Sequence, residues 1–168
     1  MIKTAGRVLT MSVLCCALLS AAAEQSKVQA DRVVIVKSER TLTLQRGGKV
    51  LKRYKVALGT NTVGPKTRQG DGKTPEGLYT IDSRNLHSQF HRSLHVSYPN
   101  AADRTRAARL KVSPGGDIMI HGLPPAYAYL GPLHRQSDWT LGCIAVTDAE
   151  IDEIWELVPN GTVVEIKP

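Results

Sequence analysis

Cysteine is scarce in this sequence. Beyond the first sixteen of its 168 residues the chain has one cysteine, Cys143, so it cannot close a disulfide within itself there. Aromatic residues are few as well, with five Tyr, two Trp and one Phe, which leaves little surface for stacking nucleic-acid bases. After residue 23 no apolar run approaches the ~18 residues that a membrane-spanning helix needs. These absences exclude a disulfide-built scaffold and a second membrane span, and they argue against nucleic acid as a partner.

Residues 1–23 have the pattern of a secretory signal peptide. Lys3 and Arg7 form a basic start, residues 8–19 form a short apolar core, and three alanines end at Ala23. We expect cleavage after Ala23, export to the periplasm and no stable membrane insertion afterwards. The remaining residues, 24–168, are long enough for one domain with a single core. Loss of the two basic residues lowers the formal net charge from +7 to +5, which suits an acidic polymer outside the cytosol.

Two further cysteines, Cys15 and Cys16, lie inside the apolar core of the predicted signal and would leave with it. A lipoprotein acylated at Cys16 is the weaker alternative, because Val13 and Leu14 stand where small residues are usual. In an oxidising compartment a lone thiol forms an intermolecular bridge, is buried and inert, or is reactive. The residues near Cys143 in the sequence indicate which of these three states applies.

The pattern of residues 24–168 is mainly β. Runs of alternating and β-branched residues predict strands, which we place at residues 32–37, 40–45, 50–58, 78–82, 93–98, 117–121 and 162–167. Gly47 and Gly48 predict a hairpin turn between the second and third runs. We expect long loops at residues 59–77 and 122–137. Asn100 is the expected N-cap of a helix that extends to residue 110.

A second helix is expected after Thr147, which forms a capping box with Glu150. Apolar residues recur at helical spacing from Ile151 to Val158, and residues 159–161, Pro-Asn-Gly, end the helix. The sequence therefore predicts a mainly antiparallel, β-sandwich-like fold with one or two helices.

Two motifs suggest other chemistries, but the residues around each motif argue against it. Residues 70–74, GDGKT, resemble the end of a phosphate-binding loop, but Thr67 stands where that loop needs glycine and Pro75 opposes a helix. We therefore read this segment as a solvated loop that flanks a cleft. His87, His91 and His95 would share one face of a helix and could bind zinc, but the last of them falls in a predicted strand. We expect no metal site and no cofactor.

His121 and Cys143 form the constellation that indicates catalysis. Each residue alone reads most simply as part of the core, but an imidazole near a thiol can take its proton and stabilise the thiolate. Gly142 has no side chain to keep a substrate backbone away, and backbone amides at this turn could bind an oxyanion. The residues alone thus favour cysteine-dependent acyl transfer.

The segments IMIHGLPP and DWTLGCIAV resemble the signature of the L,D-transpeptidase catalytic domain family. In this signature His-Gly, here His121-Gly122, precedes a Ser/Thr-any-Gly-Cys motif, here residues 140–143. Thr74-Pro75-Glu76-Gly77 and Tyr79 resemble a further family segment, and the similarity extends over residues 33–166. The form of the second motif resembles a distinct branch of the family.

The resemblance implies an exported, cofactor-free enzyme that acts on peptidoglycan stem peptides through a thioester. Cys143 would attack the carbonyl before a terminal D-alanine, and His121 would act as base and then as acid. The carbonyls of Gly122 and Leu141 would orient the imidazole, and the amides of Gly142 and Cys143, in the turn that starts at Thr140, would hold the oxyanion. We expect substrate contacts from three further residues, Tyr79, Trp139 and Arg135. A monomer is expected.

Two residues depart from the family pattern. Leu141 replaces a frequent histidine, and Ala145 replaces a frequent arginine that is read as a contact to substrate. Other arginines could supply that charge, namely Arg84, Arg104, Arg106, Arg109 and Arg135. The loss leaves the acyl acceptor open: it is an amine of a second stem, a peptidoglycan-linked lipoprotein, or water in a hydrolase that trims stems or detaches such a lipoprotein. A non-enzymatic wall-binding domain with an inactive site is a third alternative.

Overall fold

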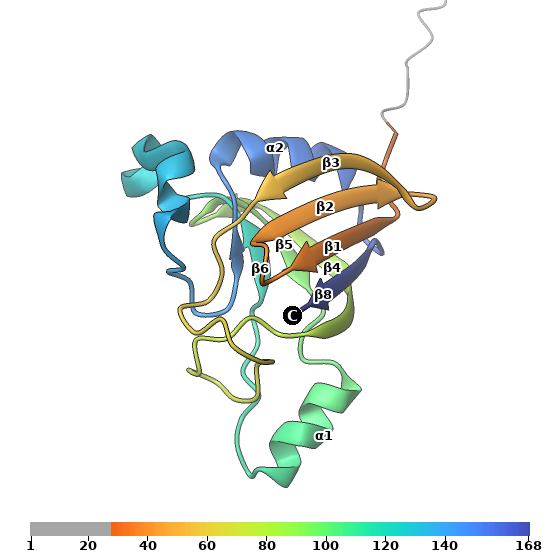
Figure 1. Ribbon diagram of the computed structural model, residues 1–168, viewed down its shortest axis with the longest axis vertical. Coiled ribbons are helices and arrows are strands. Elements are labelled where there is room, and N and C mark those ends of the chain that lie inside the picture. The colour runs from red at the N-terminus through yellow and green to blue at the C-terminus, as the bar shows by residue number, and fades with distance from the viewer. Residues whose placement is uncertain (1–27) are drawn as a thin grey trace, which may run out of the picture.

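The computed structural model describes residues 28–168, so the predicted signal peptide lies outside the described residues. Eight strands form one curled sheet in the order β3-β2-β1-β8-β4-β5-β6-β7 (Figure 1). The strands are β1 (Arg32–Val36), β2 (Thr41–Arg46), β3 (Lys49–Lys55), β4 (Gly77–Ser88), β5 (His91–Val96), β6 (Met119–His121), β7 (Ile144–Ala145) and β8 (Val163–Lys167). The pairs β1–β8 and β6–β7 are parallel and the others antiparallel. The prediction of a mainly β, mainly antiparallel fold is confirmed.

Helix α2 (Asp148–Leu157) covers β5 and β6 and closes the core. Its apolar stripe, with Ile151, Ile154 and the following Val158, is fully buried. The predicted capping box is formed, because Thr147 Oγ1 accepts from the Glu150 amide and the Glu150 carboxylate accepts from the Thr147 amide. A correctly capped, one-sided helix is what the sequence pattern requires.

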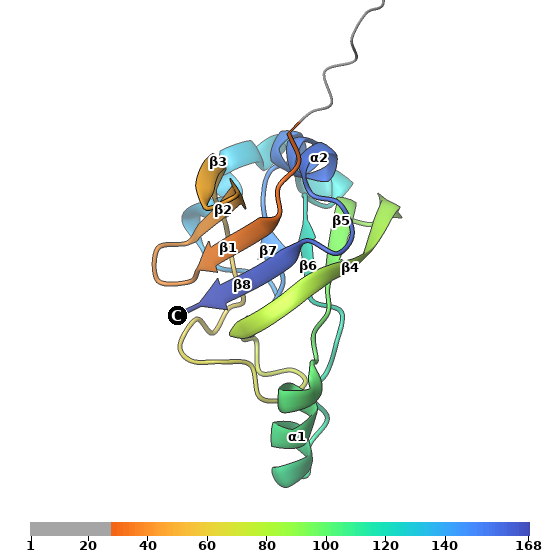
Figure 2. The same ribbon diagram turned by 90° about the vertical axis from the view of Figure 1, so that its right-hand side faces the viewer.

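Helix α1 (Ala101–Arg109) projects from one end of the sheet (Figure 2). Asn100 caps it as predicted, and few of its residues are buried. One of these, Asp103, accepts a hydrogen bond from the Tyr79 hydroxyl at 3.0 Å. This bond ties the projecting helix to β4.

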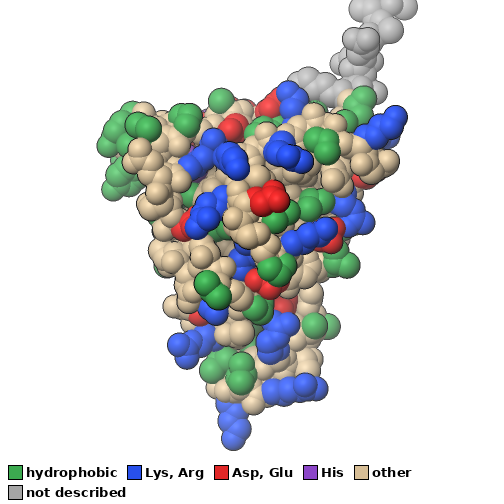
Figure 3. Space-filling model, in the orientation of Figure 1, with side chains coloured by type: hydrophobic (Ala, Val, Ile, Leu, Met, Phe, Trp, Pro, Cys, Tyr) green, Lys and Arg blue, Asp and Glu red, His purple; other side chains and the backbone are tan. Residues whose placement is uncertain are grey.

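The segment predicted as a loop at residues 122–137 contains a third helical element, η1 (Pro125–Gln136). It is a 3-10 helix interrupted at Gly131, and its prolines and short turns give no 3.6-residue periodicity to recognise in the sequence. Tyr127, Tyr129 and Leu133 are more than half exposed on it. Figure 3 shows hydrophobic side chains gathered at this end of the molecule.

The short parallel pairing of β6 with β7 places the two residues of the predicted catalytic pair. Ile120 pairs with Ile144 and His121 with Ala145. Because side chains alternate across a strand, this register puts Cys143 and His121 on the same face of the sheet. The isoleucines are fully buried on the opposite face.

The loop of residues 59–76 packs along the turn that precedes β7. Two buried ammonium groups fix it. Lys37, which follows β1, binds Glu76 Oε1 at 2.7 Å and the Gly64 carbonyl through its Nζ, and Lys66 of the loop itself binds Asp71 Oδ1 at 2.8 Å. The loop begins with Gly59, which forms a bridge with Thr140. A side chain at position 59 would lie 2.2 Å from the Gly72 carbonyl oxygen. Close backbone packing at this point therefore requires glycine.

We predict that Gly59→Ala destabilises the domain by about 2 kcal/mol, because the new methyl group meets rigid backbone on both sides. Chemical denaturation measures the change. Gly116→Ala is the matched control, since a methyl group there meets nothing within 4 Å, and we expect it to stay within about 0.5 kcal/mol of the parent protein. Equal stability of the two variants would contradict the packing described here.

Candidate active site

Cys143 and His121 both line one open cleft of about 820 Å³. Its walls come from the 59–76 loop, the end of β4, the turn before β6 and the turn before β7. The residues that line it are Lys66, Gln69, Gly70, Asn85, His87, Ser88, Gln89, Phe90, Ser93, Gly115, Gly116, Asp117, Ile118, Met119, His121, Trp139, Thr140, Leu141 and Cys143. The loop with GDGKT thus flanks the cleft.

His121 is held by its neighbour in sequence. Its Nδ1 lies 2.7 Å from the Gly122 carbonyl oxygen. A carbonyl only accepts, so Nδ1 bears the proton and Nε2 keeps its lone pair. The Phe90 ring lies 4.5 Å from the imidazole, centroid to centroid, and Trp139 meets it edge-on at 5.9 Å. Burial lowers the pKa of His121, so the ring is a neutral base at pH 7.

Cys143 is a free, partly buried thiol whose Sγ donates to the Asp117 carbonyl at 3.4 Å. Burial raises the pKa of the Cys143 thiol, and the Asp117 carboxylate adds to the increase. A hydrogen bond from the Met119 backbone and the positive charge of Lys66 act in the opposite direction. The two shifts favour the uncharged forms of both groups, a protonated thiol and a neutral imidazole.

The Thr140 hydroxyl fixes the turn before the thiol. It accepts from the Gly142 amide at 3.1 Å and donates to the Cys143 carbonyl at 2.8 Å. The Gly142 amide is thus already engaged, which corrects its expected part in the oxyanion hole. Within residues 28–168 the Cys143 amide has no acceptor, so it is the better candidate to bind an oxyanion.

Gly142 is required for a reason other than the one expected. It has φ of +130°, and a side chain there would lie 2.5 Å from the Lys73 carbonyl oxygen of the 59–76 loop. The open side of this glycine therefore faces the protein itself, not an incoming substrate. Sequence alone could not distinguish these two close approaches.

Of the three residues expected to contact substrate, the structure places one in the cleft. Trp139 lines the cleft. Tyr79 is only 4% exposed and donates its hydroxyl proton to Asp103, and Arg135 pairs with Glu150. Neither lines the cleft, so both expectations are corrected. Leu141, which is 77% exposed, stands at the rim, and the carbonyl that contacts His121 is that of Gly122.

The structure also resolves which basic side chain reaches the cleft. The arginines considered as substitutes for the missing family arginine do not line it, whereas Lys66 does. Lys66 lies in a polar loop without a strand or helix pattern, so no periodic signal marked it. Its position follows from the fold of the loop around Asp71.

The three histidines at four-residue spacing are not gathered into a metal site. His91 pairs with Asp152 at 2.8 Å and His95 with Asp82 at 2.5 Å, while His87 lines the cleft. From residue 28 onward no three potential ligands of the His, Cys, Asp or Glu type come together. The same residues include no helix long and apolar enough to span a bilayer.

Comparison with known proteins assigns this chain to a family. The model of the YkuD family, the L,D-transpeptidase catalytic domain, matches residues 30–166. The chain is 32% identical over 137 residues to "Putative L,D-transpeptidase YafK" of Escherichia coli strain K12, which covers 78% of this chain and 48% of the relative. The chain thus spans about half the length of the curated relatives it matches.

Solved structures share the fold. The helical cell shape determining protein Pgp2 of Campylobacter jejuni superposes with a TM-score of 0.64 at 23% identity, over 84% of this chain and 49% of that one. The L,D-transpeptidase of Xylanimonas cellulosilytica does so with a TM-score of 0.55 at 18% identity, over 83% and 61%. The chain therefore belongs to the L,D-transpeptidase catalytic domain family and has its curled, mainly β fold.

Proposed function

We propose that this domain is a cysteine L,D-transpeptidase that acts on the stem peptides of peptidoglycan through a thioester. One observation supports this most strongly: the β6–β7 register puts Cys143 and His121 on one face, at one cleft. The Gly122 carbonyl holds the imidazole in the tautomer that a general base needs. Family membership makes peptidoglycan the substrate class.

Acylation starts from the neutral pair. His121 Nε2 takes the thiol proton as Cys143 Sγ attacks the carbonyl that precedes the terminal D-alanine. The Cys143 amide stabilises the tetrahedral oxyanion. The C–N bond then breaks, His121 returns the proton to the leaving amine, and free D-alanine departs from a thioester on Cys143. Burial that keeps His121 neutral favours the first of these steps.

The acceptor decides between transfer and hydrolysis. An amine of a second stem gives a crosslink, and a peptidoglycan-linked lipoprotein is another possible partner for the same site. Water would instead give a trimmed stem. Ala145, where the family often has arginine, is fully buried and pairs with Ala57, so it presents no charge to an acceptor. This observation favours hydrolysis as the second candidate function.

The site of action is proposed to be the periplasm. Peptidoglycan lies outside the cytosol, and residues 1–23 have the basic start, apolar core and small-residue end of an export signal. The expected net charge of +5 after cleavage favours adsorption to an anionic wall.

We predict that Cys143→Ala abolishes both crosslinked and trimmed products. Purified residues 24–168 are incubated with isolated muropeptides, and products are identified by mass spectrometry. Crosslinked dimers that have lost D-alanine indicate transfer, and trimmed monomers alone indicate hydrolysis. Products that persist in Cys143→Ala would contradict a thioester on this residue.

We predict that Thr140→Val lowers the rate of acylation by about 10²-fold, because the turn that orients Sγ loses both hydroxyl bonds. Thr140→Ser keeps the hydroxyl and is expected to stay within a few-fold of the parent rate. Single-turnover acylation rates measure both. An unaffected Val variant would show that the hydroxyl does not position the thiol.

We predict that alkylation of Cys143 by iodoacetamide is slow at pH 7 and rises through a midpoint above the ordinary thiol value of ~8.5, because burial disfavours the thiolate. The same chain unfolded in guanidinium is the control, and its midpoint should fall at the ordinary value. A fast plateau below pH 7 that disappears in His121→Ala would instead reveal a thiolate–imidazolium pair.

A further inference from the structure

Few charges line the cleft, and they differ in sign. Among the lining residues of the described chain, Lys66 is the one Lys or Arg, and Asp117 is the one Asp or Glu. The stem peptide of the proposed reaction ends in a free carboxylate on the D-alanine that leaves. A carboxylate that enters this cleft is repelled by one of these side chains and attracted by the other.

Lys66 has donor capacity to spare. Its Nζ donates to Asp71 Oδ1 at 2.8 Å and to the Arg68 carbonyl at 3.1 Å. An ammonium group has three N–H donors, and the third has no acceptor anywhere in residues 28–168. The side chain is 4% exposed, so a hydrogen bond from it to an anion would form largely away from bulk water.

Asp71 holds Lys66 in place, but Lys66 is only one of several donors to the Asp71 carboxylate. The Asp71 carboxylate also accepts from the backbone amides of Thr67, Arg68 and Lys73. Although burial raises the pKa of Asp71, the bonds from Lys66 and these amides lower it to about 2. The carboxylate is therefore ionised throughout the physiological range, and the loop keeps the ammonium group at a fixed position.

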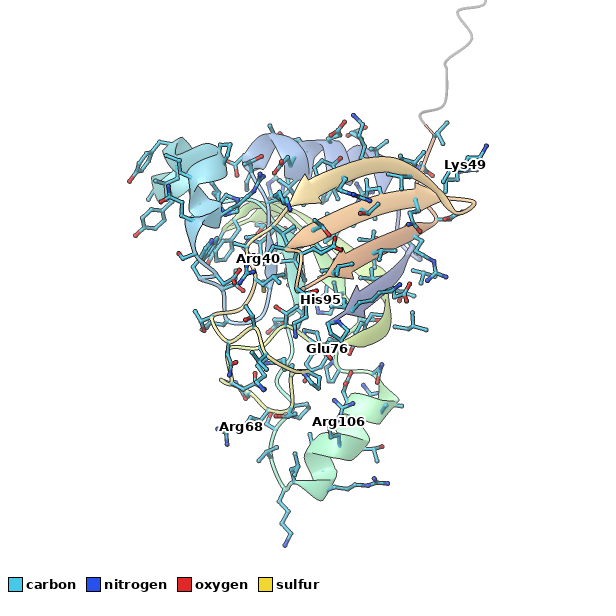
Figure 4. The ribbon with its side chains drawn as sticks, in the orientation of Figure 1. Arg40, Lys49, Arg68, Glu76, His95 and Arg106 are labelled. Atoms are coloured by element: carbon cyan, nitrogen blue, oxygen red, sulfur yellow. The ribbon has the colours of Figure 1, made fainter. Side chains whose placement is uncertain are left out.

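The other cations near this loop do not compete for the cleft. Figure 4 shows Arg68 and Arg106 at the lower end of the molecule, one on the loop and one on α1. Arg68 is exposed, and Arg106 pairs with Asp103 and donates to the Lys66 carbonyl. Lys66 is also close enough to the nucleophile for its charge to lower the pKa of the Cys143 thiol against the effect of burial.

We propose that Lys66 forms a carboxylate-binding subsite of the cleft, which takes the C-terminal carboxylate of the residue that the enzyme releases. This inference rests on the proposed function. It makes the enzyme selective for stems in which a free carboxylate follows the scissile carbonyl by one residue. In this chain Lys66 supplies the positive charge for a substrate carboxylate, which the buried Ala145 cannot supply.

The test compares two donor stems that differ only at the C-terminus, one ending in D-alanine and the other in D-alanine amide. Acyl-enzyme formation is followed by intact-protein mass spectrometry. The parent protein is expected to react at least about tenfold faster, as kcat/KM, with the acid. Lys66→Met should lose this preference because its kcat/KM falls with the acid and stays unchanged with the amide. Lys66→Arg should keep part of the preference. Lys73→Met, from the same loop but outside the cleft lining, should keep all of it.

A second readout does not need turnover. Free D-alanine should slow the alkylation of Cys143 in the parent protein, D-alanine amide should not, and Lys66→Met should lose the protection. An equal loss for acid and amide in Lys66→Met, or no acid preference in the parent, would overturn the subsite and show that Lys66 only supports the loop. A parent protein that acylates with neither stem would contradict the proposed function instead, and the protection experiment would still decide the subsite.

Discussion

The candidate site depends on a parallel ladder of two residue pairs, Ile120 with Ile144 and His121 with Ala145. A shift of β7 by one residue would turn Cys143 to the face opposite His121 and would move Ile144 off the buried face that it shares with Ile120. The hydrophobic free energy of buried Ile144 therefore favours the register that puts Cys143 and His121 on one face. So short a ladder needs support, which comes from the antiparallel bridge of Ala57 with Ala145 and from the 59–76 loop.

Burial shapes the chemistry of the pair. It raises the pKa of the thiol and lowers the pKa of the imidazole, so both groups are neutral before substrate arrives. Since the thiolate is the form that oxidants attack, a protonated resting thiol would suit the periplasm that we propose as the site of action. In the proposed mechanism charge develops only when the substrate carbonyl is in place, where the Cys143 amide and the fixed tautomer of His121 would stabilise it. On this proposal one arrangement both protects Cys143 and activates it.

Much of this could be predicted from the sequence. Most of the strands and both helix caps follow from local rules of periodicity and capping, and thiol chemistry singles out His121 and Cys143, which line one cleft. The sequence does not predict the two-residue strand β7 or the 3-10 helix η1, and the other failures concern tertiary placement. Tyr79 and Arg135 have side chains typical of a substrate site, but partners distant in sequence, Asp103 and Glu150, hold them elsewhere.

Two further features depended on contacts that sequence does not reveal. Gly142 reads as a glycine near substrate, and only the approach of Lys73 shows that the loop needs the space. Lys66 has the appearance of a solvated loop lysine, and burial by its own loop turns it into a cleft residue. A resemblance to a family located the candidate nucleophile, because its motif is local, but it did not locate Lys66, the charge that we propose in place of the arginine absent at position 145.

Intact-protein mass spectrometry of residues 24–168, quenched in acid after mixing with a stem peptide that ends in D-alanine, tests the central claim most directly. The account predicts an adduct whose mass equals the stem less D-alanine, located on Cys143 by proteolysis and strongly reduced in His121→Ala. The absence of any adduct while D-alanine is released, or an adduct on another residue, would contradict it.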